Sequence, residues 1–132
     1  MSPNTTEGFD VRYERFGNET TLQIDMEVIG FPGASGYTTM QEAEALADAL
    51  QLRAGMRVLD LGAGVGWPSL YLAPKLGYDA VLTDEPLVSM RTAARRAAAE
   101  GAGACRFAVA TGARLPFRPR TFDAILHTDV LC

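Results

Sequence analysis

The most constraining feature of the chain is a glycine-rich turn near its middle. Residues 57–61 (RVLDL) are of strand type, and Gly62, Gly64 and Gly66 follow at alternate positions. The apolar segment 68–73 comes next and predicts a helix. Glycines allow positive φ and the close approach of a ligand, and a helix start leaves free N–H groups pointing toward the same place. This order predicts a nucleotide-binding corner.

The spacing of the glycines indicates which ligand such a corner would hold. The dinucleotide pattern G-x-G-x-x-G, counted from Gly62, requires a glycine at position 67, where this chain has Trp67. A bulky indole there disfavours a pyrophosphate, and with it an NAD-dependent oxidoreductase. The pattern from Asp60 to Gly66 instead resembles the first motif of class I S-adenosylmethionine (SAM)-dependent methyltransferases. A tight turn without any ligand is the alternative explanation.

Composition narrows the classes of partner. The 132 residues allow one domain at most. With 12 basic and 16 acidic residues the net charge is −4, which disfavours nucleic acid or an anionic membrane surface. No apolar stretch approaches the length of a membrane helix. Two cysteines without metal-ligand spacing and a single histidine predict a cytoplasmic protein without a metal site. Cys105, which opens an apolar segment, is expected to be an inert buried thiol.

Strand and helix patterns alternate from residue 39 onward. Thr39 and Glu42 form a predicted capping box, and the helix it begins has an apolar stripe of Met40, Ala43, Leu46, Ala47 and Leu50. The other expected helices are 68–76 and 86–100, and the expected strands are 57–61, 79–84, 105–110 and 122–128. This alternation predicts an α/β fold, a Rossmann-like doubly wound sheet with mainly parallel strands. Residues 1–38 are expected to form an N-terminal segment or lid, and 39–132 the domain.

Several side chains outside the glycine turn are candidates for binding or packing. Asp84 ends the second expected strand, where a carboxylate can accept hydrogen bonds from both ribose hydroxyls of an adenosine ligand; the alternative is a helix N-cap. Glu85 is expected beside the same ribose or facing water. Tyr37 precedes the first helix, where its ring covers a ligand or anchors the chain. Basic residues Arg91, Arg95 and Arg96 are expected on a solvated helix face.

A second motif supports the same family. Residues 115–117 (LPF) and 121–123 (TFD) resemble a segment of the small-molecule, type 11-like branch of the methyltransferases. Phe117 and Phe122 are expected to pack under the loop, and Asp123 to cap or pair near the strand start.

The resemblance implies roles for individual residues. The methionine part of SAM would contact Asp60, Gly62, Ala63 and Gly64, and Asp84 would hold the ribose. Two loop positions that bind adenine in the family correspond to Thr111 and Gly112. Thr111 departs from the family, which usually has an acid there, and a hydroxyl accepts more weakly. His127 would lie near the methionine and the transferable methyl, either as a base or only as a strand-end residue.

The resemblance also implies the activity and its limits. It predicts SAM-dependent methyl transfer to a small-molecule acceptor, with no catalytic residue assigned. The family's sheet has seven strands in the order 3-2-1-4-5-7-6, so this chain is expected to stop after the fourth strand. We therefore expect either a fragment, possessing much of the cofactor corner, or a homodimer through the exposed fourth strand. The alternative to an enzyme is a non-catalytic SAM- or nucleotide-binding module that oligomerises.

Overall fold

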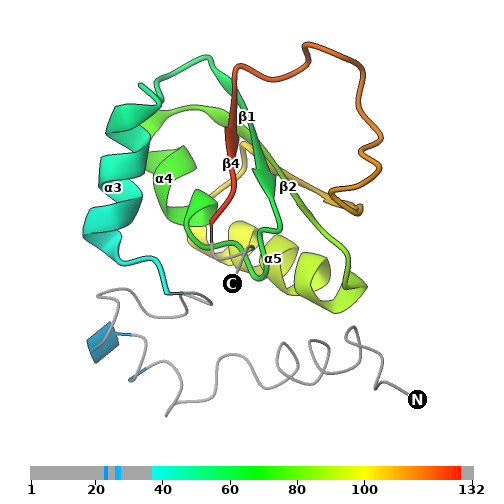
Figure 1. Cartoon of the computed structure of the whole chain (residues 1–132). Helices are drawn as coiled ribbons and strands as arrows, with labels where there is room; N and C mark the ends of the chain where they lie inside the picture. The colour runs from blue at the N-terminus through cyan, green and yellow to red at the C-terminus, as the bar shows by residue number, and fades with distance from the viewer. Residues whose placement is uncertain (1–22, 24–25, 28–36, 129–132) are drawn as a thin grey trace.

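Figure 1 shows the computed structural model of the chain, which describes residue 23, residues 26–27 and residues 37–128. The expectation of a lid over residues 1–38 lies almost entirely outside these residues. The helices are α3 (Met40–Ala49), α4 (Ser69–Leu76) and α5 (Leu87–Glu100). The strands are β1 (Arg57–Leu61), β2 (Asp79–Asp84), β3 (Cys105–Val109) and β4 (Ala124–Leu126).

The four strands form one parallel sheet in the order β3-β2-β1-β4. This arrangement confirms the predicted α/β fold, and it matches strands 3-2-1-4 of the expected order. Because all strands run in the same direction, their carboxyl ends meet at one edge of the sheet. Ligands of such sheets bind in the crevice outside those ends.

Strand β4 is shorter than the predicted 122–128 because the residues before it take other roles. The Phe122 ring packs edge-on against Phe117, with 5.0 Å between the ring centres. Asp123 pairs with Arg57 at the start of β1: its carboxylate accepts from the Arg57 N–H at 2.8 Å, and its own N–H donates to the Arg57 carbonyl at 2.7 Å. Both expectations for this segment are therefore confirmed.

The described helices pack against one face of the sheet. Strand side chains alternate between faces, and those on the same face as Val58 and Asp60 join α3, α4 and α5 in a single hydrophobic core. On the opposite face, Leu59 is 1% exposed. The long segment after β3, drawn in orange in Figure 1, contributes Leu115, Phe117 and Phe122 to a groove beside Leu59.

Helix boundaries follow the capping signals. Thr39 and Glu42 form the predicted capping box, with the Thr39 N–H donating to Glu42 at 2.8 Å and the Glu42 N–H donating to Thr39 Oγ1 at 3.2 Å. Gly77 and Gly101 end α4 and α5 in the left-handed region, as glycine permits. The α3 stripe is narrower than predicted, since Ala43 and Ala47 are buried whereas Leu46 and Leu50 are over one-third exposed.

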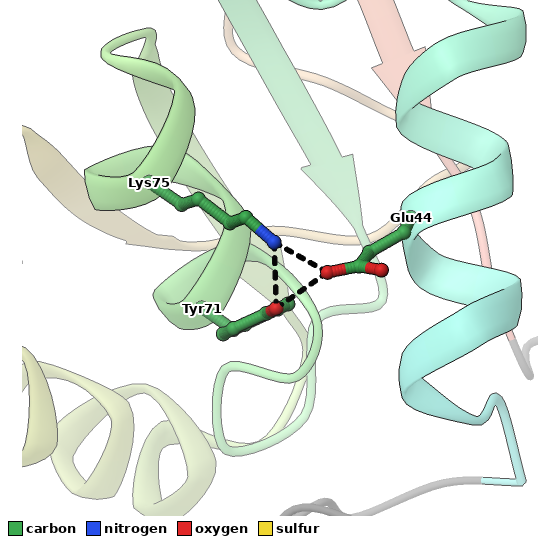
Figure 2. A network of polar contacts seen from close by, with 3 residues as sticks. All are labelled: Glu44, Tyr71 and Lys75. Carbon is green, nitrogen blue, oxygen red and sulfur yellow. Dashed lines mark hydrogen bonds and ion pairs between the residues drawn. The ribbon is translucent and has the colours of Figure 1, made fainter.

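A polar network joins α3 to α4 (Figure 2). The Tyr71 hydroxyl donates to Glu44 Oε1 at 2.7 Å, and Lys75 Nζ donates both to Glu44 and, at 3.0 Å, to the Tyr71 hydroxyl. The Lys75 hydrogen bond is the main reason that the pKa of Glu44 lies below its ordinary value. This network fixes α3 beside α4, which begins directly after the glycine turn.

The glycine turn itself contains a site where no side chain fits. Gly66 has φ +109°, and a Cβ built on it would lie 2.4 Å from Leu70 Cδ1. We expect Gly66→Ala to lower the free energy of unfolding by about 2–4 kcal/mol, because backbone strain and overpacking add. Urea denaturation measures this loss.

Gly103→Ala is the matched control for that substitution. Gly103 has no atom within 4 Å of a built Cβ and no positive φ, so we expect a change of less than about 0.5 kcal/mol. Equal unfolding midpoints for the two variants would contradict the proposed steric role of Gly66.

Candidate functional site

The turn after β1 is held by its own backbone hydrogen bonds. The N–H groups of Gly62 and Ala63 both donate to the Thr83 carbonyl, at 2.8 and 2.9 Å, and the Gly66 N–H donates to the Ala63 carbonyl at 2.9 Å. Gly62, Gly64 and Gly66 all have positive φ, which explains why glycine occupies each of these positions. The turn is therefore preformed at the carboxyl ends of β1 and β2.

Asp84 connects the end of β2 to this turn. One carboxylate oxygen accepts from the Gly64 N–H at 2.9 Å and the other from the Glu85 N–H at 2.9 Å. Partial burial raises the pKa of Asp84 above its ordinary value, and the two backbone hydrogen bonds oppose that shift. Asp84 does not cap α5, which begins at Leu87 without a side-chain cap. The structure thus places Asp84 beside the turn, as predicted.

Asp60 lies beneath the turn and faces the protein interior. It is 1% exposed, and its Oδ2 accepts from the Ser69 hydroxyl at 2.6 Å. Among the described residues its Oδ1 and the buried Tyr78 hydroxyl have no hydrogen-bond partner. Burial raises the pKa of Asp60 to about 7, opposed by the Ser69 hydrogen bond and reinforced by the nearby Asp84 charge. A direct contact between Asp60 and a ligand stays a prediction.

Trp67 is buried where a dinucleotide turn would have its third glycine. It is 5% exposed, its Nε1 donates to the Thr38 carbonyl at 2.8 Å, and its ring stacks on Tyr71 with 5.7 Å between centres. The indole therefore anchors the chain before α3 to the turn. Tyr37, which was expected either to cover a ligand or to anchor the chain, is 79% exposed.

The contact between Arg96 and the glycine turn was not predicted from the sequence. Arg96 was expected on a solvated helix face with Arg91 and Arg95, which are indeed exposed. The Arg96 side chain is instead only 13% exposed: its Nη1 donates to the Val65 carbonyl at 2.9 Å, and its Nε pairs with Glu100 at 3.2 Å. Helical spacing alone could not have distinguished Arg96, because the contact joins α5 to the glycine turn. The expectation was wrong for Arg96.

A groove with a volume of about 400 Å³ opens beside the end of β2. Its lining comprises Glu85, Val109, Ala110, Thr111, Arg114 and Pro116. The Thr111 hydroxyl accepts from the Ala113 N–H at 3.2 Å. Gly112 lies over the end of β1, where an added Cβ would contact Leu61 at 3.5 Å. The groove thus brings together the predicted residues Glu85 and Thr111.

The remaining predicted residue, His127, directly follows β4 and is exposed. It lies at the same edge of the sheet as the glycine turn, because β4 pairs with β1 in parallel. Cys105 is buried, and burial raises its pKa to about 11, as an inert thiol requires.

Two features are absent from the part of the chain that the structure describes. No helix there is long and apolar enough to cross a membrane. No group of three or more histidine, cysteine, aspartate or glutamate side chains is arranged there to hold a metal ion.

Comparison with known proteins decides the family. Residues 58–132 match the family described as "Methyltransferase domain". The chain belongs to this family. The match includes the glycine turn, Asp84, the groove and His127, and it confirms the resemblance seen in the sequence, with SAM as the methyl donor that the resemblance implies.

A curated relative agrees with this assignment, and a solved structure has a similar fold. A curated relative is phosphoethanolamine N-methyltransferase 1 of Triticum aestivum, 30% identical over 122 residues, which are 92% of this chain and 22% of that protein. A similar solved structure concerns conversion of a disulfide bond into a thioacetal group during echinomycin biosynthesis; it is 28% identical, with TM-score 0.67, and covers 96% of this chain and 48% of that one. The chain thus spans about a fifth of the curated relative.

The expectation that nucleic acid is excluded as a partner is not supported. An RNA methyltransferase from Salinibacter ruber in complex with S-adenosyl-L-homocysteine is also a structural neighbour, 19% identical with TM-score 0.53, covering 56% of this chain and 49% of that one. At this identity the likeness shows the fold alone. Because an RNA methyltransferase shares this fold, the negative net charge of the chain does not by itself exclude nucleic acid as the acceptor.

The buried carboxyl of Asp60 predicts a specific pH dependence of stability. Its pKa is about 7 in the folded protein and 3.8 as a free side chain, so folding favours the protonated form. The contribution of the protonated carboxyl to the free energy of unfolding is fully present below about pH 4. It is lost as the pH rises to about 7, at up to about 1.4 kcal/mol per pH unit. Urea denaturation at several pH values measures this slope.

Asp60→Asn is the variant that tests this origin. The amide keeps an oxygen for the Ser69 hydroxyl and does not titrate, so the stability of the variant should be flatter than that of the wild type between pH 4 and 7. Parallel pH profiles for the two proteins would show that Asp60 is ionised when folded.

Proposed function

We propose that the chain binds SAM in the crevice formed by the glycine turn, Asp84 and the groove, and that the whole protein transfers its methyl group to a small-molecule acceptor. The observation that supports this proposal most directly is the hydrogen bond that the Gly64 N–H donates to the Asp84 carboxylate, at 2.9 Å. This contact holds a partly buried carboxylate next to the glycine backbone, which supports a ribose-binding role for Asp84. Family membership supports the reaction class.

The hydrogen bonding of the turn favours this ligand over a dinucleotide. A pyrophosphate needs free N–H groups, whereas those of Gly62, Ala63, Gly64 and Gly66 already donate within the protein. The side-chain charges near the turn are also negative, from Asp84 and Glu85. Carboxylates there suit a ligand that carries an ammonium and a sulfonium, and they repel phosphates.

The chain's own contribution to catalysis would be placement. SAM supplies an activated methyl group, which an acceptor atom can take by in-line displacement without a covalent enzyme intermediate. Asp84 would hold the ribose, and the glycine turn would support the methionine part. Fixing both fragments presents the methyl group to the acceptor in one orientation, and orientation of this kind accounts for a large part of the rate.

The name of the wheat relative supports a small-molecule acceptor for this chain. We also keep the cytoplasm as the proposed location, because the cysteine usage favours a reducing compartment. Neither inference names the acceptor.

We further propose that β4 forms the interface of a homodimer. It is an edge of the described sheet, and Ile125 on it is 54% exposed. Exposed apolar edges favour pairing with another chain. Light scattering should therefore show a dimer, and Ile125→Lys should shift it toward monomer. Val109→Lys, on the opposite edge strand β3, is the control and should leave the dimer intact; a monomeric wild type at high concentration would contradict the proposal.

Asp84→Ala tests the ligand assignment by calorimetric titration with S-adenosylhomocysteine. We expect affinity to fall at least about tenfold, since charge-assisted hydrogen bonds to the ribose are lost. Asp79→Ala removes a carboxylate from the other end of the same strand and should have little effect. Binding of NAD in place of S-adenosylhomocysteine, or unchanged affinity in a folded Asp84→Ala variant, would contradict the assignment.

A further inference from the structure

The groove beside Asp84 has a hydrogen-bonding character that bears on which nucleobase it takes. The inference below rests on the proposed function, in which Asp84 binds the ribose. Asp84 is paired in register with Val109, and the Ala110 N–H donates to the Asp84 carbonyl at 3.0 Å. A base attached to that ribose would therefore extend toward Val109 and Ala110, which line the groove.

The polar side chains of the groove differ in what they can offer to a base. Glu85 can only accept hydrogen bonds, and it adjoins Asp84 at the ribose end. Arg114 can only donate, because a guanidinium has no acceptor. The Thr111 hydroxyl can do both, since it accepts from the Ala113 N–H and still has its own hydrogen to donate. The turn that carries these two residues is closed by the Arg114 N–H, which donates to the Thr111 carbonyl at 3.1 Å.

Adenine and hypoxanthine differ at position 6, where the first has an amino donor and the second a carbonyl acceptor. A site that demands the amino group needs an obligate acceptor facing it. Thr111 and Arg114 provide an adaptable hydroxyl and an obligate donor instead. We propose that this groove binds a purine nucleoside without requiring the 6-amino group, and that Thr111 and Arg114 determine this tolerance.

The test is calorimetric titration of the full chain with S-adenosylhomocysteine and with S-inosylhomocysteine. The two ligands should bind with affinities within about tenfold of one another. A site built to bond the missing group would reject the analogue by about 10⁴-fold or more. Preference for the adenosine ligand above tenfold overturns the proposal. Failure of both ligands to bind overturns the proposed function itself, so the two failures are distinguishable.

Substitutions identify the residues responsible. Thr111→Asp introduces an obligate acceptor and should raise the preference for the adenosine ligand at least about tenfold. Arg114→Ala should weaken the inosine ligand more than the adenosine ligand. Arg118→Ala is the control: this arginine is exposed and lines the other groove, beside Leu59, so the affinity ratio should not change. An unchanged ratio in a folded Thr111→Asp variant would overturn the role of Thr111.

Discussion

The candidate site depends on the contact between Asp84 and the Gly64 N–H. It joins the ends of the two central strands, together with their sheet ladder, the Thr83 carbonyl and the Thr83 hydroxyl, which donates to the Asp60 carbonyl at 3.3 Å. Asp84 is only partly buried, and each of its two oxygens can accept one more hydrogen bond in addition to the one it accepts within the protein. Because Asp84 shapes the turn, a substitution there is expected to change both the local structure and the affinity for a ligand. The effect of any change at Asp84 must therefore be compared with its effect on folding.

The same turn is fixed from three further directions. Trp67 ties it to the segment before α3, Arg96 holds the Val65 carbonyl from α5, and Ser69 contacts Asp60 from the first residue of α4. Each contact comes from a different helix or from the chain before one. A preorganised turn does not lose conformational entropy when a ligand binds, which favours affinity. Packing of the helices on one face of the sheet thus determines the geometry of the crevice at its edge.

Much of this fold could be predicted from local signals. The capping box at Thr39, the glycines that end α4 and α5, and the strand–glycine–helix order each act over a few residues, where sequence patterns are informative. The predicted pairing of Asp123 also rested on a local argument about the strand start. The bounds of β4 and the exposure of Leu46 could not be obtained in this way, because both depend on which distant segment packs against them.

The proximity of Asp84 to the glycine turn was predictable from the sequence, whereas the electrostatics of Asp60 and Asp84 were not. Parallel strands bring Asp84 and the glycine turn to one edge, so their proximity follows from the fold class. Burial is a property of the assembled core, and it leaves Asp60 in the interior with a pKa near neutrality while Asp84 remains partly exposed. The two acids, each near the end of its strand, therefore differ in burial and in the groups they contact.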